Sequence, residues 1–455
     1  MFPFLPIYVP LTLMAISNKK QTDIDMGVRV NNSWQVDRLR YLYLFMIVLY
    51  AGQSGELCGL IGYDHDHPIV FIIPILMTIL LISKYKLPAF NRSFKIVIGV
   101  LTLWFLVQYI YHRGGLNLSL TFFHYYQLTL CYIIIMHYRE KLFYIYEDII
   151  YKLAVFSLVL WGISLILPQP MAMFFRMAGH ATDTTEGSIF IYTMMQLSRV
   201  EDFHILRNAG FAWEPGRYAC FLCLAIFCNF LMYGFRFKNN RRLWVLIVAL
   251  FSTQSTTGLS TLMVLMGAFI LSENFRSKFL WVSFLIPIAM YIYGLDFMGE
   301  KIEHGIETQM EIDRHSGTED SYALDRIESG IIELMNWQQA PITGYGEWRY
   351  SYFTQLVGLG YYTNNGTITL LAKYGLLGLL YYLCIFLSSK RIARYFGNKV
   401  SLGYLILYIC IGMGYDFNQI VLVMSFSFWG VFMPSRTLRQ FDQPRSLPQV
   451  INENL

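Results

Sequence analysis

Long apolar runs, separated by short charged or turn-forming segments, set the pattern of this chain. About twelve of them approach the roughly 20 residues that an α-helix needs to cross a bilayer. We therefore predict an all-α fold: a polytopic integral membrane helical bundle of about 12 spans, whose boundaries are set by charges and turn signals. The predicted spans are Tyr41–Leu60, Pro68–Ser83, Phe94–Tyr111, Ser119–Met136, Ile149–Leu167, Pro215–Tyr233, Leu243–Ser252, Leu259–Leu271, Phe279–Leu295, Thr367–Leu387, Leu402–Gly414 and Ile420–Met433.

Lysine and arginine concentrate in every second connection between these spans. The positive-inside rule makes those connections cytoplasmic, together with the basic segments near both ends of the chain. All connections agree with one orientation, and a miscounted span would break that agreement. The basic segments are residues 19–40, 84–95, 139–152, 236–242, 276–278, 390–399 and 436–445.

Two long outer connections stand out among otherwise short ones, at residues 168–214 and 299–366. They are the candidates for a working surface, because the short connections leave little room for a site. Residues 1–17 are apolar and rich in proline, and form either an extra span or an interfacial piece. No positive charge precedes them, which argues against a cleaved signal peptide. The predicted units are 1–40, an N-terminal apolar piece and basic stretch; 41–298, the bundle; 299–366, the large extracytoplasmic loop; 367–433, the C-terminal spans; and 434–455, a cytoplasmic tail.

The large outer loop contains a segment with helical apolar spacing, Tyr322–Trp337. Its pattern predicts an amphipathic helix that lies on the membrane or caps the bundle. The turn-forming sequence Pro341–Gly346 follows it.

A polar turn, Thr253–Gly258, joins two spans that are too short to cross comfortably. This predicts a hairpin whose tip stops below the outer surface, because polar backbone at that depth must face protein or a watery cavity. Two interpretations stay open: a cavity wall beside the helix that follows Glu214, or a packing contact between helices through Ser and Thr.

Composition supports the membrane assignment and narrows the functions. The chain is 55% hydrophobic and 14% charged, and its net charge of +5 lies mostly in connections. We expect no nucleic-acid binding from this charge distribution. The seven cysteines fall in or beside apolar runs, so neither a disulfide framework nor a metal cluster is expected.

The passage from Arg207 to Tyr218 is polar and charged, and it opens directly into an apolar run. Pro215 suits the first turn of a helix, where its missing N–H loses nothing. The resulting helix N-terminus carries unpaired N–H groups and a partial positive charge at one membrane face. With Arg207 and Arg217 beside it, this terminus is suited to bind an anion such as a phosphate.

Glu214 lies among these cations, which would hold its carboxylate ionised. Either it forms a structural ion pair with Arg217 at the start of the helix, or it has a chemical role. The residues alone leave both interpretations open.

Three patches follow one another in the second half of the chain and together resemble a known family. They resemble the O-antigen polymerase and O-antigen ligase family of bacterial envelope glycosyltransferases, over roughly residues 207–387. The earlier spans are similar to it only in hydropathy. The patches are Arg207-x-x-Gly210-x-x-x-Glu214-Pro215-x-x-x-Ala219; Ser255-Thr256-Thr257-Gly258; and Arg326, Pro341-x-x-Gly344-x-Gly346, Asn364-Asn365-Gly366 and Lys373-Tyr374-Gly375-Leu376-Leu377-Gly378.

The resemblance implies a glycosyltransferase that joins polyprenyl-pyrophosphate-linked oligosaccharide repeat units, of O-antigen or capsule type. A sugar hydroxyl of one repeat would attack the anomeric carbon of a lipid-linked chain, and polyprenyl pyrophosphate would leave. The implied location is the bacterial cytoplasmic (inner) membrane, with the active site facing the periplasm or outside. The implied partners are the lipid-linked donor and acceptor and membrane lipids, with a chain-length regulator and a flippase as further candidates; no cofactor and no metal is expected.

Several residues can be matched to that reaction. Arg207 and Arg217 would stabilise the charge that builds on the leaving pyrophosphate, and Glu214 would serve as general base or would orient the arginines. Arg326, Asn364, Asn365 and Tyr345 are candidates for binding pyrophosphate or glycan.

Position 364 distinguishes two activities of the family. The ligases resemble one another in a His immediately before the Asn of the third patch, whereas this chain has Asn364. We therefore favour a polymerase over a ligase. A flippase of lipid-linked glycans would show charges within several spans and two related halves, and a membrane acyltransferase would need a His in an apolar site; neither pattern is found.

The remaining polar residues carry less weight. The run Asp64–His67 lacks a third ligand group nearby, so metal coordination is not expected. Arg349 and His304 are more typical of a solvated surface, and His315 is a weak catalytic candidate. Asp416 lies at an outer turn, which weakens a functional interpretation.

Overall fold

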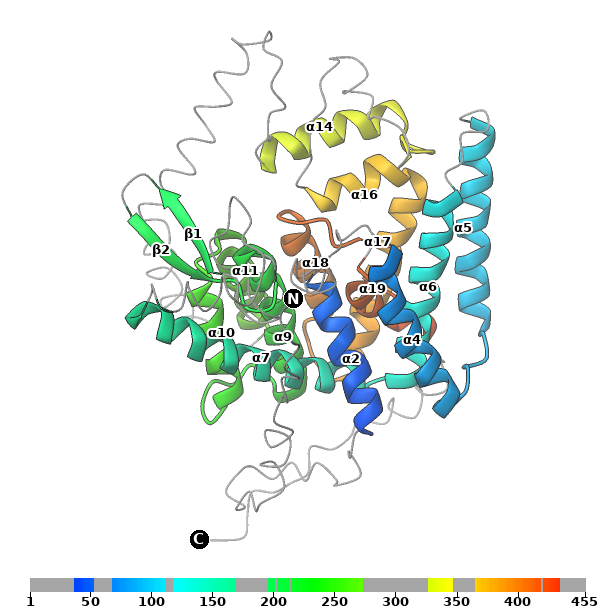
Figure 1. The fold of residues 1–455 in the computed structure, drawn as a ribbon. Helices are drawn as coiled ribbons and strands as arrows, with labels where there is room; N and C mark the ends of the chain where they lie inside the picture. Colours follow the sequence, from blue (N-terminus) through cyan, green and yellow to red (C-terminus); the bar gives the residue numbers. More distant parts are fainter. Residues whose placement is uncertain are drawn as a thin grey trace, which may run out of the picture.

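The computed structural model describes residues 37–52, 68–111, 118–167, 170, 195–200, 203–212, 214–272, 326–346, 365–418 and 420–433. In these ranges the chain is predominantly helical (Figure 1). The elements are α2 (Arg38–Ala51), α4 (Pro68–Tyr85), α5 (Arg92–Tyr111), α6 (Leu118–Tyr138), α7 (Lys141–Ile166), β1 (Met195–Val200), β2 (Phe203–Asn208), α9 (Pro215–Tyr233), α10 (Arg241–Ser252), α11 (Thr256–Leu271), α14 (Arg326–Gln339), α16 (Gly366–Tyr374), α17 (Leu376–Tyr395), α18 (Gly403–Gly412), α19 (Val421–Ser427) and α20 (Trp429–Phe432).

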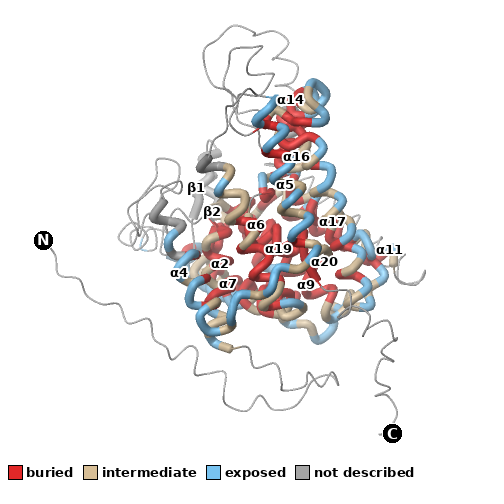
Figure 2. Tube along the Cα trace, turned by 90° about the vertical axis from the view of Figure 1, so that its right-hand side faces the viewer, coloured by how far each residue is buried: buried red, intermediate tan, exposed pale blue. Residues whose placement is uncertain are grey.

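Helix α9 is the buried centre of the bundle. Every residue from Pro215 to Leu231 is buried (Figure 2). A helix that is apolar all round is stable only when other elements surround it. In this bundle α9 is surrounded by helices α7, α10, α11 and α18, which pack against it.

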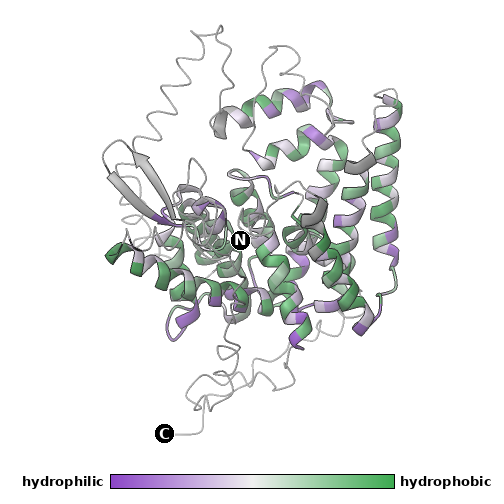
Figure 3. Ribbon diagram, in the orientation of Figure 1, coloured by the Kyte–Doolittle hydropathy of each residue, from purple (hydrophilic) through white to green (hydrophobic). Residues whose placement is uncertain are grey.

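The outer helices of the bundle consist largely of hydrophobic residues (Figure 3), and many of their large apolar side chains are exposed. On α5, Leu103 is 60% exposed and Ile110 is 68% exposed, although both are large and apolar. Such a surface is costly in water and favourable in hydrocarbon. Among the described residues, helices α5, α7, α9 and α17 are long and apolar enough to cross a membrane, and three shorter apolar helices accompany them. The protein is therefore a multi-pass membrane protein, and the count of 12 spans stays a prediction.

The predicted spans need several corrections. Helix α7 begins at Lys141, eight residues before the predicted Ile149, because charged residues at its start are paired within the bundle rather than solvated. The predicted span Thr367–Leu387 is two helices, α16 and α17, since Gly375 adopts a left-handed φ of 55° between them. Helix α2 ends at Ala51. The predicted span Phe279–Leu295 lies outside the described residues.

The prediction of an all-helical fold misses one hairpin in the outer connection 168–214. Strands β1 and β2 pair antiparallel, with Met195 opposite Asn208. The sequence of β1, MQLSRV, begins with the period-two alternation of a strand. The hairpin ends at Arg207 and Asn208, and so it leads the chain into the passage before α9.

Described residues of the predicted cytoplasmic connections gather at one end of the bundle, and the membrane face that this end meets stays a prediction. At one end the first turns of α2, α7 and α10 meet the last turns of α9. Trp429 Nε1 donates to the Arg139 carbonyl (2.9 Å), and Asn91 Nδ2 donates to the Phe432 carbonyl (2.6 Å), which brings the C-terminal end of α20 to the same side. The opposite end carries the layer of α14 and α16 (Figure 1), and the end of β2 contacts the C-terminal end of α10 through Arg207 and the Thr253 carbonyl.

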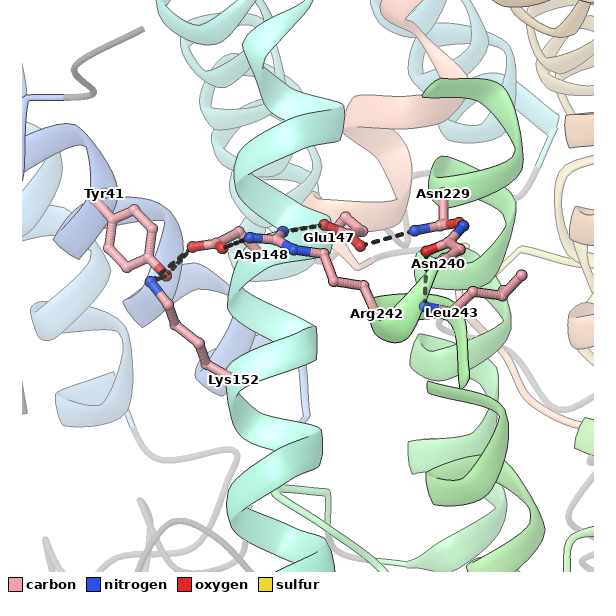
Figure 4. Close-up of polar contacts among 8 residues, drawn as sticks. All are labelled: Tyr41, Glu147, Asp148, Lys152, Asn229, Asn240, Arg242 and Leu243. Atoms are coloured by element: carbon pink, nitrogen blue, oxygen red, sulfur yellow. Dashed lines mark hydrogen bonds and ion pairs between the residues drawn. The ribbon is translucent and has the colours of Figure 1, made fainter. Parts of the chain in front are cut away.

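A network of charged and amide side chains joins four helices at the first of these ends (Figure 4). Arg242 of α10 contacts Glu147 (2.7 Å) and Asp148 (2.9 Å) of α7. Glu147 also accepts from Asn229 of α9 (3.0 Å), and Asp148 accepts from Tyr41 of α2 (3.0 Å). Glu147 is only 1% exposed, so its charge depends on these partners.

We predict that Arg242→Ala destabilises the folded protein by on the order of 3 kcal/mol, because it leaves the buried Glu147 carboxylate without a cation. The measurement is the thermal melting temperature in detergent. The matched control is Arg241→Ala, which changes the exposed neighbouring arginine and is expected to have little effect. Equal melting temperatures for the two variants would contradict the role of the network.

Candidate functional site

The passage before α9 folds as a tight turn that fixes the start of that helix. Gly210 adopts a left-handed φ of 54°, and a Cβ there would overlap the ring of Tyr218. Asn208 is buried; its amide donates to Ser157 and Ser252, and its carbonyl oxygen accepts from Gly210 N (2.9 Å). The position of Gly210 in the first patch therefore has a local steric cause in this chain.

Arg207 holds the tip of the hairpin formed by α10 and α11. Its Nε donates to the Thr253 carbonyl (3.1 Å), and its Nη2 donates to the Gln254 carbonyl (3.2 Å). These carbonyls lie at the C-terminal end of α10, where the helix dipole favours a cation. The structure thus gives Arg207 a positioning role between β2 and the hairpin.

The hairpin tip packs directly on the first turns of α9. Ser255 caps α11 by accepting from Gly258 N (3.2 Å). A Cβ on Gly258 would lie 2.5 Å from the Cβ of Ala219. Of the two interpretations left open for the turn Thr253–Gly258, the contacts support the packing contact.

Loop 414–418, between α18 and α19, brings the three patches of the sequence together. The Tyr415 hydroxyl fills the space beside Gly216 of the first patch. Gly414 lies against Thr257 of the second patch. Gly366 of the third patch packs on the backbone of Tyr415 and Asp416, whose Cα lies 2.5 Å from the position of a Cβ on Gly366. The three patches therefore form one site around this loop.

Arg217 points into this site from α9. Its side chain is 7% exposed, its Nη2 donates weakly to the Ala51 carbonyl (3.4 Å), and its guanidinium carbon lies 5.5 Å from the centre of the Phe417 ring. Its Nε is buried without a hydrogen-bond partner. Within the described ranges, no carboxylate forms an ion pair with it. A buried guanidinium with spare donors is an incomplete site for an anion.

Glu214 and Asp416 are the carboxylates whose charges act on Arg217 at longer range. Glu214 occupies the N-cap of α9 with extended backbone, but its side chain does not cap the helix. The N–H groups of the first turn are therefore left for another acceptor. Asp416 is more constrained: it accepts from Asn418 N (3.0 Å) and lies 4.0 Å from Lys373 Nζ. Of the two interpretations left open for Glu214, the structural ion pair with Arg217 is not supported, because the two side chains do not form one in this structure.

The third patch forms a backbone clamp at the break between α16 and α17. Gly344 adopts φ of 68°, and its Cα lies so close to the Lys373 carbonyl that a Cβ cannot fit. Tyr345 N donates to the Ala372 carbonyl (3.0 Å), and Leu376 N donates to the Ile342 carbonyl (2.9 Å). The Pro341–Gly346 turn and the segment after Lys373 can pack this closely only because Gly344 and Gly375 have no Cβ.

Asn365 and Tyr345 both join α16 to α14. Asn365 is buried, caps α16 by accepting from Ile368 N (3.2 Å), and packs on Gly330. The Tyr345 hydroxyl donates to Glu333 (3.3 Å). These contacts give both residues structural roles, and a role in binding substrate stays a prediction.

Helix α14 matches the helix predicted in the outer loop, and most of its apolar side chains face outward. Ser329, Glu333 and Asn336 are buried against α16, whereas Leu334 and Met335 are exposed. The polar face packs inward because it meets the hydrogen-bonding groups of Asn365 and Tyr345. The buried carboxylate of Glu333 was not identified from the sequence.

Some candidates lie outside the described residues: Asn364, Arg349, His304, His315 and the run Asp64–His67. The side chain of Arg326, the first residue of α14, is likewise outside the description. In the part that is described, no group of three or more His, Cys, Asp or Glu is arranged to hold a metal ion.

Residues 242–383 match the family model described as O-antigen ligase. This segment is about a third of the chain, and it is similar to the O-antigen polymerase and ligase family. The predicted resemblance is thereby confirmed, and the family consists of glycosyltransferase-like enzymes that act on lipid-linked glycans in the membrane. No curated protein and no solved structure matched the chain.

The family segment contains the second and third patches, whereas Arg207, Glu214 and Arg217 lie before it. Loop 414–418 lies after it. The site therefore combines the family segment with elements from both sides of it. The outer-turn position of Asp416 gave no sign in the sequence that its loop joins the patches. The available signal is a set of small residues, Gly216, Gly366 and Gly414, that let this loop approach the helices.

We predict that Gly366→Ala separates α16 from loop 414–418, because the new Cβ would meet backbone rather than a flexible side chain. The expected destabilisation is about 1–3 kcal/mol, measured as a lower melting temperature in detergent. The matched control is Gly267→Ala in α11, where nothing lies within 4 Å of the new Cβ. A melting temperature for Gly366→Ala equal to that of the control would show that the close approach is not required.

Proposed function

We propose that this protein is a polysaccharide polymerase that joins polyprenyl-pyrophosphate-linked oligosaccharide repeat units at the outer face of the cytoplasmic membrane. The observation that carries the proposal is the buried Arg217, which has unused donors at the point where loop 414–418 meets the start of α9. The family match supports transfer of lipid-linked glycans and does not support a flippase.

The proposed reaction is a displacement at the anomeric carbon of the donor glycan. A hydroxyl oxygen of the acceptor repeat forms the new glycosidic bond, and the bond from the anomeric carbon to the pyrophosphate oxygen breaks. The electron pair leaves with polyprenyl pyrophosphate, which gains a negative charge. The hydroxyl proton passes to a carboxylate. The product is a glycan longer by the transferred unit.

Arg217 is the residue suited to the leaving pyrophosphate. Charge stabilisation is strongest where the donor is fixed in advance and water is excluded. Burial and the Phe417 ring exclude water from the guanidinium. The first turn of α9 adds backbone N–H groups and the partial positive charge of the helix N-terminus, both of which favour an anion there. Arg207 donates to the hairpin carbonyls, so its role is to hold the hairpin in place beside the start of α9.

Glu214 is the better candidate for the proton acceptor. Its carboxylate makes no hydrogen bond within the described ranges and is partly exposed at the mouth of α9. Asp416 already accepts from Asn418 N and faces Lys373. A free carboxylate within reach of the acceptor hydroxyl fulfils the first requirement of a general base.

The choice of polymerase over ligase follows from Asn364. The ligases that the third patch resembles have a His at that position, and an Asn cannot accept a proton at neutral pH. A ligase of the same superfamily is the alternative.

Arg217→Met is expected to lower transfer activity by about 100- to 1,000-fold. Its melting temperature should stay the same or rise, because a buried cation without a counterion is replaced by an apolar side chain of similar length. Arg207→Ala should lower both the activity and the melting temperature, because it removes the hydrogen bonds to the Thr253 and Gln254 carbonyls of the hairpin. The measurements are glycan chain length and thermal melting of each purified variant.

Two carboxylate variants complete that series. Glu214→Gln is expected to abolish long-chain glycan, whereas Asp416→Asn should retain most of it. Normal chain length in both Arg217→Met and Glu214→Gln would exclude the proposed site.

Deletion of the gene tests the proposed reaction as a whole. A polymerase deletion is expected to leave single-repeat glycan on the lipid acceptor, because transfer of the first unit is intact. Loss of all glycan from that acceptor would instead indicate a ligase. The matching experiment in vitro supplies purified protein with its lipid-linked repeat, without added metal or nucleotide, and measures whether longer glycans form.

A further inference from the structure

The start of α2, the end of α4 and the end of α6 meet at the end of the bundle that is predicted to be cytoplasmic (Figure 1). Asp37, the N-cap of α2, forms an ion pair with Lys84 in the last turn of α4 (2.8 Å). The Tyr138 hydroxyl at the end of α6 donates to the Arg40 carbonyl in α2. These contacts hold the ends of the three helices together at one corner of the bundle.

Each of the three helices contributes one polar aromatic or cationic side chain to this corner: Arg40 from α2, Tyr85 from α4 and His137 from α6. The guanidinium carbon of Arg40 lies 4.2 Å from the centre of the Tyr85 ring. The ring centres of Tyr85 and His137 are 6.1 Å apart. A guanidinium that lies over a ring keeps its in-plane N–H groups for an acceptor.

Two atoms of this group are buried without a hydrogen-bond partner in the part of the chain that the structure describes: Arg40 Nε and His137 Nε2. A buried donor without an acceptor is unfavourable, so such atoms are expected to meet a ligand. Asp37, the carboxylate at this corner, is already paired with Lys84. The group therefore lacks an anionic acceptor, and a phosphate is the anion that a guanidinium binds most specifically.

Helix α4 indicates that this phosphate belongs to a lipid. Leu76 and Leu80 precede Lys84 by eight and four residues, so the three side chains lie on one face of the helix. Leu76 is 54% exposed and Leu80 is 52% exposed, as expected of side chains that face hydrocarbon. Acyl chains that pack on this face place their head group beside Lys84, at the corner that holds Arg40. Basic pockets between membrane helices on the cytoplasmic side are typical sites for anionic phospholipids.

We propose that Arg40 and His137 bind the phosphate group of an anionic phospholipid from the leaflet that surrounds this end of the bundle. Arg40 donates to the phosphate oxygens through its guanidinium, and His137 donates through Nε2 when that nitrogen carries the proton. The acyl chains lie along α4, and Lys84 adds positive charge. The bound lipid joins three helices and stabilises the folded protein. The proposal does not depend on the proposed reaction, because it involves none of the residues assigned to that reaction.

The first experiment measures the thermal melting temperature of the purified full-length protein in detergent, with and without phosphatidylglycerol. The ionic strength is kept high, because salt screens exposed charges more than buried ones. We expect phosphatidylglycerol to raise the melting temperature more than phosphatidylethanolamine does at the same concentration, since a ligand that binds only the folded state stabilises it. Equal shifts with the two lipids would overturn the proposal.

Glycerol 3-phosphate tests the other source of a phosphate group. It carries the same anion without acyl chains, and it is expected to leave the melting temperature nearly unchanged at the concentration at which phosphatidylglycerol acts. A shift as large as that of phosphatidylglycerol would identify a site for a soluble phosphate compound and exclude the lipid.

Arg40→Met should weaken the binding of phosphatidylglycerol by about tenfold, measured as bound lipid by native mass spectrometry. The contact between α2 and α6 is retained, because Tyr138 donates to the Arg40 carbonyl and not to its side chain. The matched control is Arg38→Met, which removes an exposed arginine from the same turn of α2 and should have little effect at high ionic strength. Equal losses in the two variants would indicate general charge attraction and contradict a specific site.

His137→Phe separates the hydrogen bond from the ring contact. It keeps an aromatic ring beside Tyr85 and removes the unpaired nitrogen, so it is expected to weaken phosphatidylglycerol binding by about fivefold. Binding of phosphatidylethanolamine should be the same in this variant and in the wild type. Wild-type binding of phosphatidylglycerol by both His137→Phe and Arg40→Met would exclude the site.

Discussion

The close approach of loop 414–418 to the first turn of α9 is the contact on which the candidate site depends. It requires Gly216, Gly366 and Gly414, since a Cβ at any of them would meet the loop or a neighbouring side chain. Because these residues come from three distant parts of the chain, the same contact joins the hairpin, the outer helices and the start of α9. Arg217 is buried as a consequence, and its guanidinium meets an aromatic ring in place of a carboxylate.

The two ends of the bundle use charge in opposite ways. At one end Arg242 is matched by Glu147 and Asp148, and amide groups satisfy the rest. That network is complete without a ligand and holds four helices together. At the other end Arg217 has donors left over. A protein can tolerate such a cost where function requires it, and the contrast between the two arginines separates a structural ion pair from a site prepared for an anion.

The three patches that resemble the family prove to be partly structural. Arg207 fastens the hairpin tip, Asn365 caps α16, and Gly344 allows two backbone segments to touch. These roles explain residue types that could also have been assigned to chemistry. The remaining candidates for chemistry are Arg217 and Glu214, which have hydrogen-bonding capacity that the fold does not use.

The sequence by itself determined the membrane class, the order of most helices, the helix at Arg326–Gln339 and the start of α9 at Pro215, because hydropathy, proline and charge act locally. It also identified the family through motif order. Only the tertiary structure decided that α16 and α17 are separate helices, that a β-hairpin precedes α9, and that loop 414–418 joins the patches. Those features depend on contacts between residues far apart in the chain. The hydropathy pattern along the sequence does not specify which glycine will pack against which distant loop.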